Sequence, residues 1–213
     1  MVIKSPDAKV CVSAPFFVSD REIQAFIRER WDWILQNRAK VLERSAQLPP
    51  AHTFVTGEKH CLFGEEYELQ VLESSAGPAI HLRYDKIILV VKPGTPAERR
   101  AKIMAEWYRV RLQNELYTLM NKWMCLLNEP EVTWSIRQMK ARWGSCCPQK
   151  RSMLFNLELA RMPLPCVEYV VVHEFTHLQE RYHNDHFKAL MTVHLPQWRT
   201  LKKELNTFAQ THR

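Results

Sequence analysis

Glycine is scarce in this chain, with five residues among 213. None of the five belongs to a glycine-rich loop of the kind that cradles phosphate groups, which argues against that type of nucleotide site. The sequence also has no apolar run of the roughly 20 residues that a membrane-spanning helix needs. Its first ten residues, MVIKSPDAKV, lack the hydrophobic centre of a secretory signal. We therefore expect a cytoplasmic protein without a membrane partner.

Cysteine pairs of the metal-binding type are absent as well. None of the six cysteines stands in a CxxC arrangement, which argues against a zinc ribbon. In a chain that is not secreted, reduced and partly buried thiols are the expected state. Cys146 and Cys147 are adjacent, and the sequence leaves open whether they have a functional role.

The net charge of +7 allows an anionic partner but does not require one. The basic residues are spread along the chain, as on an ordinary solvated surface. A basic nucleic-acid-binding module, whose metal site recruits or cleaves bound partners, is a further alternative. No zinc-finger or helix-turn-helix signature supports that alternative.

The most informative segment is 173–183, which reads HEFTHLQERYH. On an α-helix, positions i and i+4 lie on one face, with roughly 6 Å between their Cβ atoms. His173 and His177 can therefore direct ring nitrogens at a single ion. Glu174 can then approach a water molecule on that ion without being a ligand. Three protein ligands plus an open water position are typical of catalytic zinc, so the motif predicts metal-assisted hydrolysis.

The third histidine constrains the local structure. On a continuous helix His183 would be rotated by about 240° from His177 and would face away. It can complete the site only if the helix ends between them. Asn184 and Asp185 favour turns and helix N-caps. We therefore expect the helix to stop near Arg181 and a new helix to begin near Asp185.

The first 92 residues are predicted to be rich in strands. Residues 8–14 alternate like a strand, and Ser19 with Asp20 precedes a helical pattern that continues to about Arg44. Four short blocks rich in branched and aromatic residues follow between 52 and 92. Turn-forming residues separate these blocks, which predicts an antiparallel β meander.

The remaining residues, 93–213, are predicted to form the catalytic region. A long helix starts after Thr95, and strands are expected at 132–138 and 152–158 with a loop containing WGSCCPQK between them. Pro165 suits the first turn of the helix that carries His173 and His177. Pro196 interrupts the last helical segment. We expect one α+β domain over 1–213, with a β-rich region at 1–92 and the catalytic region at 93–213.

Three segments carry a resemblance to a known family. They are MKARWGSC (139–146), FNLELARMP (155–163) and YVVVHEFTHLQERYHNDHF (169–187). With them the chain resembles the YgjP-like family of zincin-type metal-dependent hydrolases, which is related to WLM and SprT-like metallopeptidases. The resemblance extends over nearly the whole chain and is most specific at 139–187.

The resemblance implies that His173, His177 and His183 bind Zn²⁺ and that Glu174 is the catalytic carboxylate. It also implies a zincin-like fold, in which the HExxH helix packs under a small sheet whose edge strand faces the cleft. Families of this shape are called metallopeptidases, yet some YgjP-like members are described as pyrophosphatases that act on UTP. The fold alone leaves the substrate open.

Both activities share one mechanism. Zinc lowers the pKa of its bound water to about 7, and Glu174 accepts the proton. Arg142, Ser145 and Asn156 are the candidates that stabilise the oxyanion. Our main hypothesis is a zinc metallopeptidase with a peptide or protein substrate. The alternative is a metal-dependent nucleoside triphosphate (UTP) pyrophosphatase.

The two substrates predict different clefts. A peptide would add to an exposed sheet edge, for which the segment 152–158 is the best candidate. A triphosphate requires several positive groups around the metal, and these would be Arg142 with Lys140, Lys150 or Arg151. Three or more arginine and lysine head groups in the cleft would favour the nucleotide, whereas a bare strand edge with at most one would favour the peptide.

Overall fold

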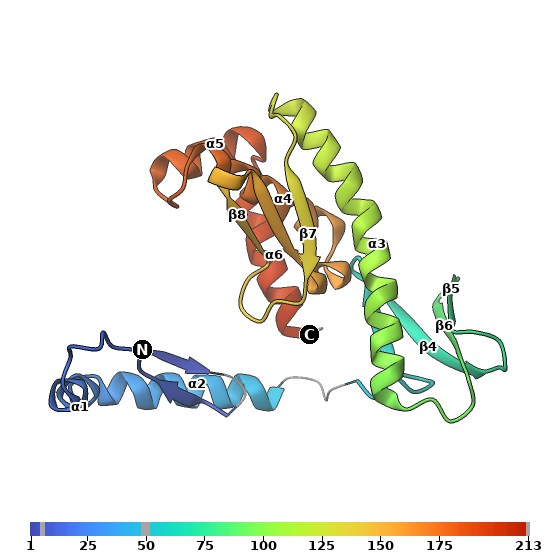
Figure 1. Ribbon diagram of the computed structural model, residues 1–213, viewed down its shortest axis with the longest axis horizontal. Coiled ribbons are helices and arrows are strands. Elements are labelled where there is room, and N and C mark those ends of the chain that lie inside the picture. The colour runs from blue at the N-terminus through green and yellow to red at the C-terminus, as the bar shows by residue number, and fades with distance from the viewer. Residues whose placement is uncertain (5–6, 48–51, 212–213) are drawn as a thin grey trace. The chain divides into compact units, whose positions relative to one another are not determined.

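The computed structural model describes residues 1–4, 7–47 and 52–211. It has the mixed α+β fold that the sequence predicts (Figure 1). The Cα positions group into two units, residues 1–50 and 51–213. The two units are described separately below. The division at residue 92 stays a prediction.

The first unit contains a β hairpin and two helices. Strands β1 (Val2–Lys4) and β2 (Lys9–Cys11) pair antiparallel. Helix α1 (Asp20–Glu29) begins with a capping box, in which the Ser19 backbone N–H donates to Glu22 at 2.9 Å. Helix α2 (Trp31–Gln47) follows directly. The single helix predicted up to Arg44 is therefore wrong at Arg30, which leaves the helical region with φ −106° and ψ 17°.

The second unit starts with a four-stranded sheet. Its strands are β3 (Lys59–Leu62), β4 (Glu65–Glu73), β5 (Ala79–Arg83) and β6 (Lys86–Val91), and they lie in the order β3-β4-β6-β5. Because β4 and β6 pair parallel, the predicted antiparallel meander is wrong. The most apolar strand, β6, takes a central position and β5 lies at the edge. This order buries alternate residues of β6 and leaves the less apolar β5 at the rim.

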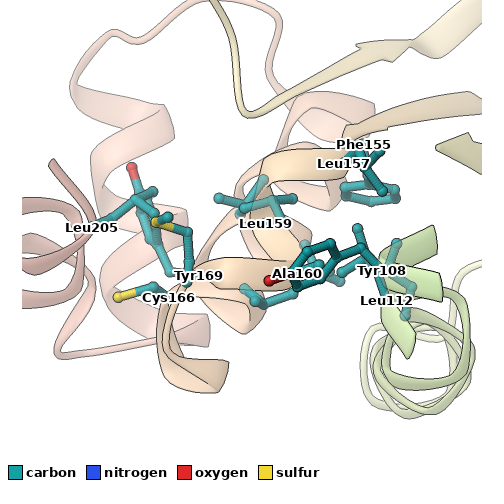
Figure 2. Packing of buried hydrophobic residues seen from close by; sticks show 14 of the residues in the cluster. Tyr108, Leu112, Phe155, Leu157, Leu159, Ala160, Cys166, Tyr169 and Leu205 are labelled. Atoms are coloured by element: carbon teal, nitrogen blue, oxygen red, sulfur yellow. The ribbon is translucent and has the colours of Figure 1, made fainter. Parts of the chain in front are cut away.

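Helix α3 (Ala97–Leu126) confirms the long helix predicted after Thr95. Its buried stripe follows helical spacing and packs into one core with the four-stranded sheet and the C-terminal elements. Figure 2 shows Tyr108 and Leu112 of this stripe together with C-terminal residues of the same core. Tyr108 lies in this stripe, and its hydroxyl donates to the Cys61 carbonyl at 3.0 Å. The helix therefore joins the β-rich segment to the region of the histidine motif.

A three-stranded sheet follows in the order β7-β9-β8, and its strands are β7 (Thr133–Arg137), β8 (Gly144–Cys147) and β9 (Ser152–Asn156). The two predicted strands are present as β7 and β9, but the predicted loop between them contains β8. β9 is the central strand, because it pairs parallel with β7 and antiparallel with β8. The proposal of 152–158 as the sheet edge is therefore wrong, and β8 is the edge nearest the histidines.

The remaining elements are helical. Two 3₁₀ turns, η1 (Pro148–Lys150) and η2 (Leu157–Arg161), flank β9. Helix α4 (Leu164–Gln179) carries the histidine motif and has Pro165 in its first turn, as predicted. Helices α5 (Asp185–His194) and α6 (Trp198–Thr211) are separated around Pro196. Within the described residues, no helix is long and apolar enough to span a membrane.

Candidate metal centre

Three histidine side chains meet beside β8. His173 and His177 project from one face of α4, with 4.8 Å between their ring centroids. His183 comes from the turn that follows, and its Nε2 lies 3.0 Å from Nε2 of His173. Each of the three offers a ring nitrogen within 4.8 Å of the others. The structure thus brings together the three residues that the sequence nominates as metal ligands.

The turn after α4 brings His183 back to the site. Helix α4 ends at Gln179, because Glu180 takes an extended conformation with φ −136° and ψ 117°. This end is two residues before the one expected from the sequence. Asn184 then caps α5, accepting the Phe187 backbone N–H at 2.9 Å. The new helix starts at Asp185, as predicted.

Two contacts orient the imidazole rings. Nδ1 of His177 lies 3.0 Å from the Glu180 carbonyl oxygen. A ring that donates its proton there presents an unprotonated Nε2, which is the form that ligates a metal. Phe187 is buried, and its ring centroid lies 4.8–5.0 Å from those of all three histidines. Sequence reasoning missed Phe187, since an apolar residue on a helix gives no signal of its own.

The protonation state of the cluster fits a metal. Burial lowers the pKa of His173 to about 3, and the neighbouring His177, His183 and Lys202 act in the same direction. Burial also lowers the pKa of His183. Neutral imidazoles are the metal-binding form. Three imidazole nitrogens that line one cleft fit zinc better than magnesium or calcium, which prefer oxygen ligands.

Glu174 is buried between α4 and β8. Its Oε2 has no hydrogen-bond partner within the described residues. Gly144 of β8 lies so close that a Cβ atom there would be 2.9 Å from Cδ of Glu174. Any side chain at position 144 would displace the carboxylate, so this close approach requires glycine. Burial raises the pKa of Glu174 to about 8, while the positive charge of Arg142 acts to lower it.

These groups line a cleft of about 710 Å³. Its walls are the four residues of β8, one face of α4 and the turn that carries His183. Tyr169 and Arg181 also line the cleft, although sequence reasoning did not select them. Tyr169 lies one turn before His173 on α4, with 5.8 Å between the two ring centroids.

The three candidates for oxyanion stabilisation differ in position. Arg142 lines the cleft and its charge acts on Glu174. Ser145 also lines the cleft, but the pleat of β8 directs its side chain to the face opposite that of Gly144. Asn156 is buried and does not line the cleft. Its amide donates to the carbonyl oxygens of Met139 and Arg142 at 2.9 and 2.7 Å, so Asn156 holds the loop that carries Arg142.

Two arginines, Arg142 and Arg181, are the cationic residues lining the cleft within the described part of the chain. Lys140, Lys150 and Arg151 are not among its lining residues. Arg151 donates instead to Glu129 at 2.8 Å. The cleft therefore has two positive groups, fewer than the three expected for a nucleotide substrate and more than the one expected for a peptide.

Comparison with known proteins adds the following. A family model described as "YgjP-like, metallopeptidase domain" matches residues 1–208. No curated protein matches the chain. Among solved structures, the metallopeptidase zymogen of Pyrococcus abyssi abylysin matches 45% of this chain and 96% of its own, with 17% identity and a TM-score of 0.41. The family match covers almost every element described above.

Proposed function

The chain belongs to the YgjP-like family, and on that premise we propose that it is a zinc-dependent peptidase that cleaves extended peptide segments. A metallopeptidase domain is a metal-dependent hydrolase, whereas the zinc, its ligands and the peptide substrate are our proposals. One observation carries them. Three imidazole groups, a buried glutamate and an unpaired strand edge line the same cleft.

His173, His177 and His183 would hold the zinc ion. Bound zinc supplies a Lewis acid and lowers the pKa of an attached water to about 7. The contact between His177 Nδ1 and the Glu180 carbonyl supports this ligand set, because a second hydrogen bond of this kind fixes the ring orientation of a ligating histidine.

Glu174 would be the general base. It adjoins His173 in the chain and lines the cleft, so that its carboxylate can take a proton from the attacking water. The same group can then return the proton to the leaving amine. Burial raises the pKa of this carboxyl, which favours the second transfer, whereas the first transfer requires the ionised carboxylate. Arg142, at the cleft wall, is the candidate that stabilises the oxyanion.

The edge of β8 would align the substrate. In the described residues β8 pairs on one side alone, with β9. The Asn156 N–H donates to the Trp143 carbonyl at 2.8 Å, and bonded and non-bonded pairs alternate along an antiparallel ladder. Gly144 and Cys146 therefore direct their backbone N–H and C=O groups outward. An extended peptide can pair with these groups whatever its side chains are.

A triphosphate substrate has less support. The two arginines of the cleft do not make a phosphate cradle, and the phosphate groups of a nucleotide do not match the alternating donors and acceptors of the β8 edge. Peptide main chain matches those groups in both geometry and polarity. We therefore favour the peptide substrate.

The test compares the zinc-loaded protein with Glu174→Gln on peptide and nucleoside triphosphate panels. Peptide cleavage that the variant loses is the expected result. The best peptide is then resynthesised with one backbone nitrogen methylated at a time. Methylation should abolish cleavage at alternate positions, because alternate N–H groups face a strand partner. Turnover of triphosphates alone, lost in Glu174→Gln, would refute the peptide assignment.

A further inference from the structure

A second group of metal-ligand side chains lies at the start of the second unit. His52 and Glu58 belong to the loop before β3, and His60 is the second residue of β3. Each of the three offers one ligand atom, and these atoms all lie within 4.8 Å of one another. The sequence HTFVTGEKH (52–60) contains all three within nine residues.

The distances fit metal ligation better than hydrogen bonding. Oε2 of Glu58 lies 3.4 Å from Nδ1 of His52 and 3.3 Å from Nε2 of His60. Good N–H···O hydrogen bonds are shorter, at about 2.9–3.0 Å. Two ligands bound to zinc at about 2.0–2.1 Å with a tetrahedral angle are roughly 3.3–3.4 Å apart. The two separations from Glu58 are therefore close to those between two ligands of one tetrahedral ion, before any movement of the His52 ring.

His60 supplies an independent observation. Its side chain is 0% exposed, yet neither ring nitrogen has a hydrogen-bond partner within the described residues. A buried polar group without a partner is destabilising. Nε2 points at the carboxylate oxygen that His52 also faces. An ion at that point would give Nε2 the partner that it lacks.

The donor groups are those of a metal site. Burial opposes ionisation of Glu58, but hydrogen bonds from Thr53 and Phe54 outweigh it and lower its pKa to about 2. Burial lowers the pKa of His60 to about 4, and the charges of His52 and Arg161 add to this effect. The cluster combines one carboxylate with two imidazole groups. This is the donor set of a borderline divalent ion such as zinc.

We propose that His52, Glu58 and His60 form a second zinc site, separate from the three histidines on and after α4. Water would take the fourth position on the solvent side, where the His52 and Glu58 side chains are 27% and 19% exposed. The two imidazole rings are stacked, with 4.2 Å between centroids and 23° between planes. Binding therefore requires the His52 ring to turn about its Cβ–Cγ bond toward Glu58, because a metal lies close to the plane of each ligating ring.

The site would fix the loop that contains His52 and Glu58 to β3, and β3 leads into the catalytic region. The segment after β3 bonds directly to η2, because Phe63 N–H donates to the Ala160 carbonyl at 2.9 Å and Gly64 N–H donates to that of Arg161 at 3.1 Å. Helix α4 begins three residues after η2. A metal that joins the loop to β3 would thus stabilise β3 and η2, the elements that lead into α4, without taking part in hydrolysis.

The test counts zinc per chain by elemental analysis after equilibrium dialysis in micromolar zinc. Four proteins are compared: the wild type, a first-site variant with His173, His177 and His183 all changed to Ala, His52→Ala, and the combination. We expect two, one, one and no ions. His81→Ala is the matched control, because His81 is an exposed histidine of the same sheet that lies outside the cluster; it should keep two.

The zinc counts of the four proteins distinguish a failure of this proposal from a failure of the proposed function. Counts of one, none, one and none would overturn the second site and leave the first intact. Counts of one, one, none and none would do the opposite. Circular dichroism verifies the fold of each variant. If His52→Ala does not fold, the first-site variant still decides, because its His52 loop is unchanged: one bound ion supports the second site and none refutes it.

Discussion

The contact between Gly144 and Glu174 leads to a quantitative prediction. In Gly144→Ala the new Cβ would lie 2.9 Å from both Cδ and Cγ of Glu174. Real Cβ contacts of this length essentially do not occur, so either β8 or the carboxylate must move. The helix cannot retreat, because Val170, Val171 and Phe175 on α4 are 3%, 0% and 0% exposed. We expect the carboxylate to be displaced toward the cleft.

The displacement should affect both stability and catalysis. Overpacking of a filled interior by one methyl group costs about 1–3 kcal/mol in the free energy of unfolding. A shift of about 1 Å in a catalytic group lowers the rate by about 100-fold. Zinc content should not change, because the substitution touches none of the three histidines. Loss of turnover with full zinc content is therefore the expected signature.

Urea denaturation and kcat/KM on a cleaved peptide measure the two effects, and elemental analysis measures the zinc. Gly77→Ala is the matched control, since nothing lies within 4 Å of the Cβ position there and its φ is not left-handed. This variant should behave like the wild type. The stability measurement does not need a known substrate.

A double-mutant cycle tests the cause. In a Glu174→Ala background the atoms that meet the new Cβ are gone, so the cost of Gly144→Ala should fall to within about 0.5 kcal/mol of zero. A Gly144→Ala variant with wild-type stability and turnover would show that β8 does not pack on Glu174 as described. An equal cost in both backgrounds would show that the strain arises elsewhere.

Three further outcomes are expected. Glu174→Gln should keep its zinc and lower kcat by about 10²–10⁴-fold, because an amide cannot accept the proton; wild-type turnover would refute the assigned base. His183→Ala should lose zinc affinity far more than His186→Ala, its control on the next helix, and equal losses in competition with a chromophoric chelator would mean that the turn is misassigned. Asn156→Ala should lower the unfolding free energy by about 1–3 kcal/mol, because the carbonyl groups of Met139 and Arg142 lose the buried amide that donates to them; an unchanged urea midpoint would contradict this.

The sequence predicted the features that depend on neighbours along the chain. The i, i+4 spacing of His173 and His177 defines one helix face, and the capping preference of Asn184 predicts where the next helix begins. The turn that returns His183 follows from those two facts. The stripe of buried residues on α3 could be predicted for the same reason, because its spacing is a property of a single helix. Both helical predictions depend on contacts within a few residues.

Strand order was decided by the tertiary structure. Strand β8 is four residues long, too short for an alternating pattern to distinguish it from a loop. Nothing in the sequence says that β9 is central or that β4 and β6 run parallel, because strand order depends on which distant segments bury one another. The prediction that 152–158 forms the substrate edge is wrong for this reason, because β8 is the edge strand nearest the histidines.

The surroundings of the site also required the fold. Gly144 is separated from Glu174 by thirty positions in the sequence. The two residues come close to one another only because β8 packs on α4. The same holds for Phe187 beneath the three imidazole rings. Residues 52–60 supply a metal-ligand spacing, but β3 must bury His60 before its nitrogens lack partners. The chain by itself determines which chemical groups are present and how helices orient them, whereas burial, close approach and free strand edges are non-local and exist only after distant segments have packed.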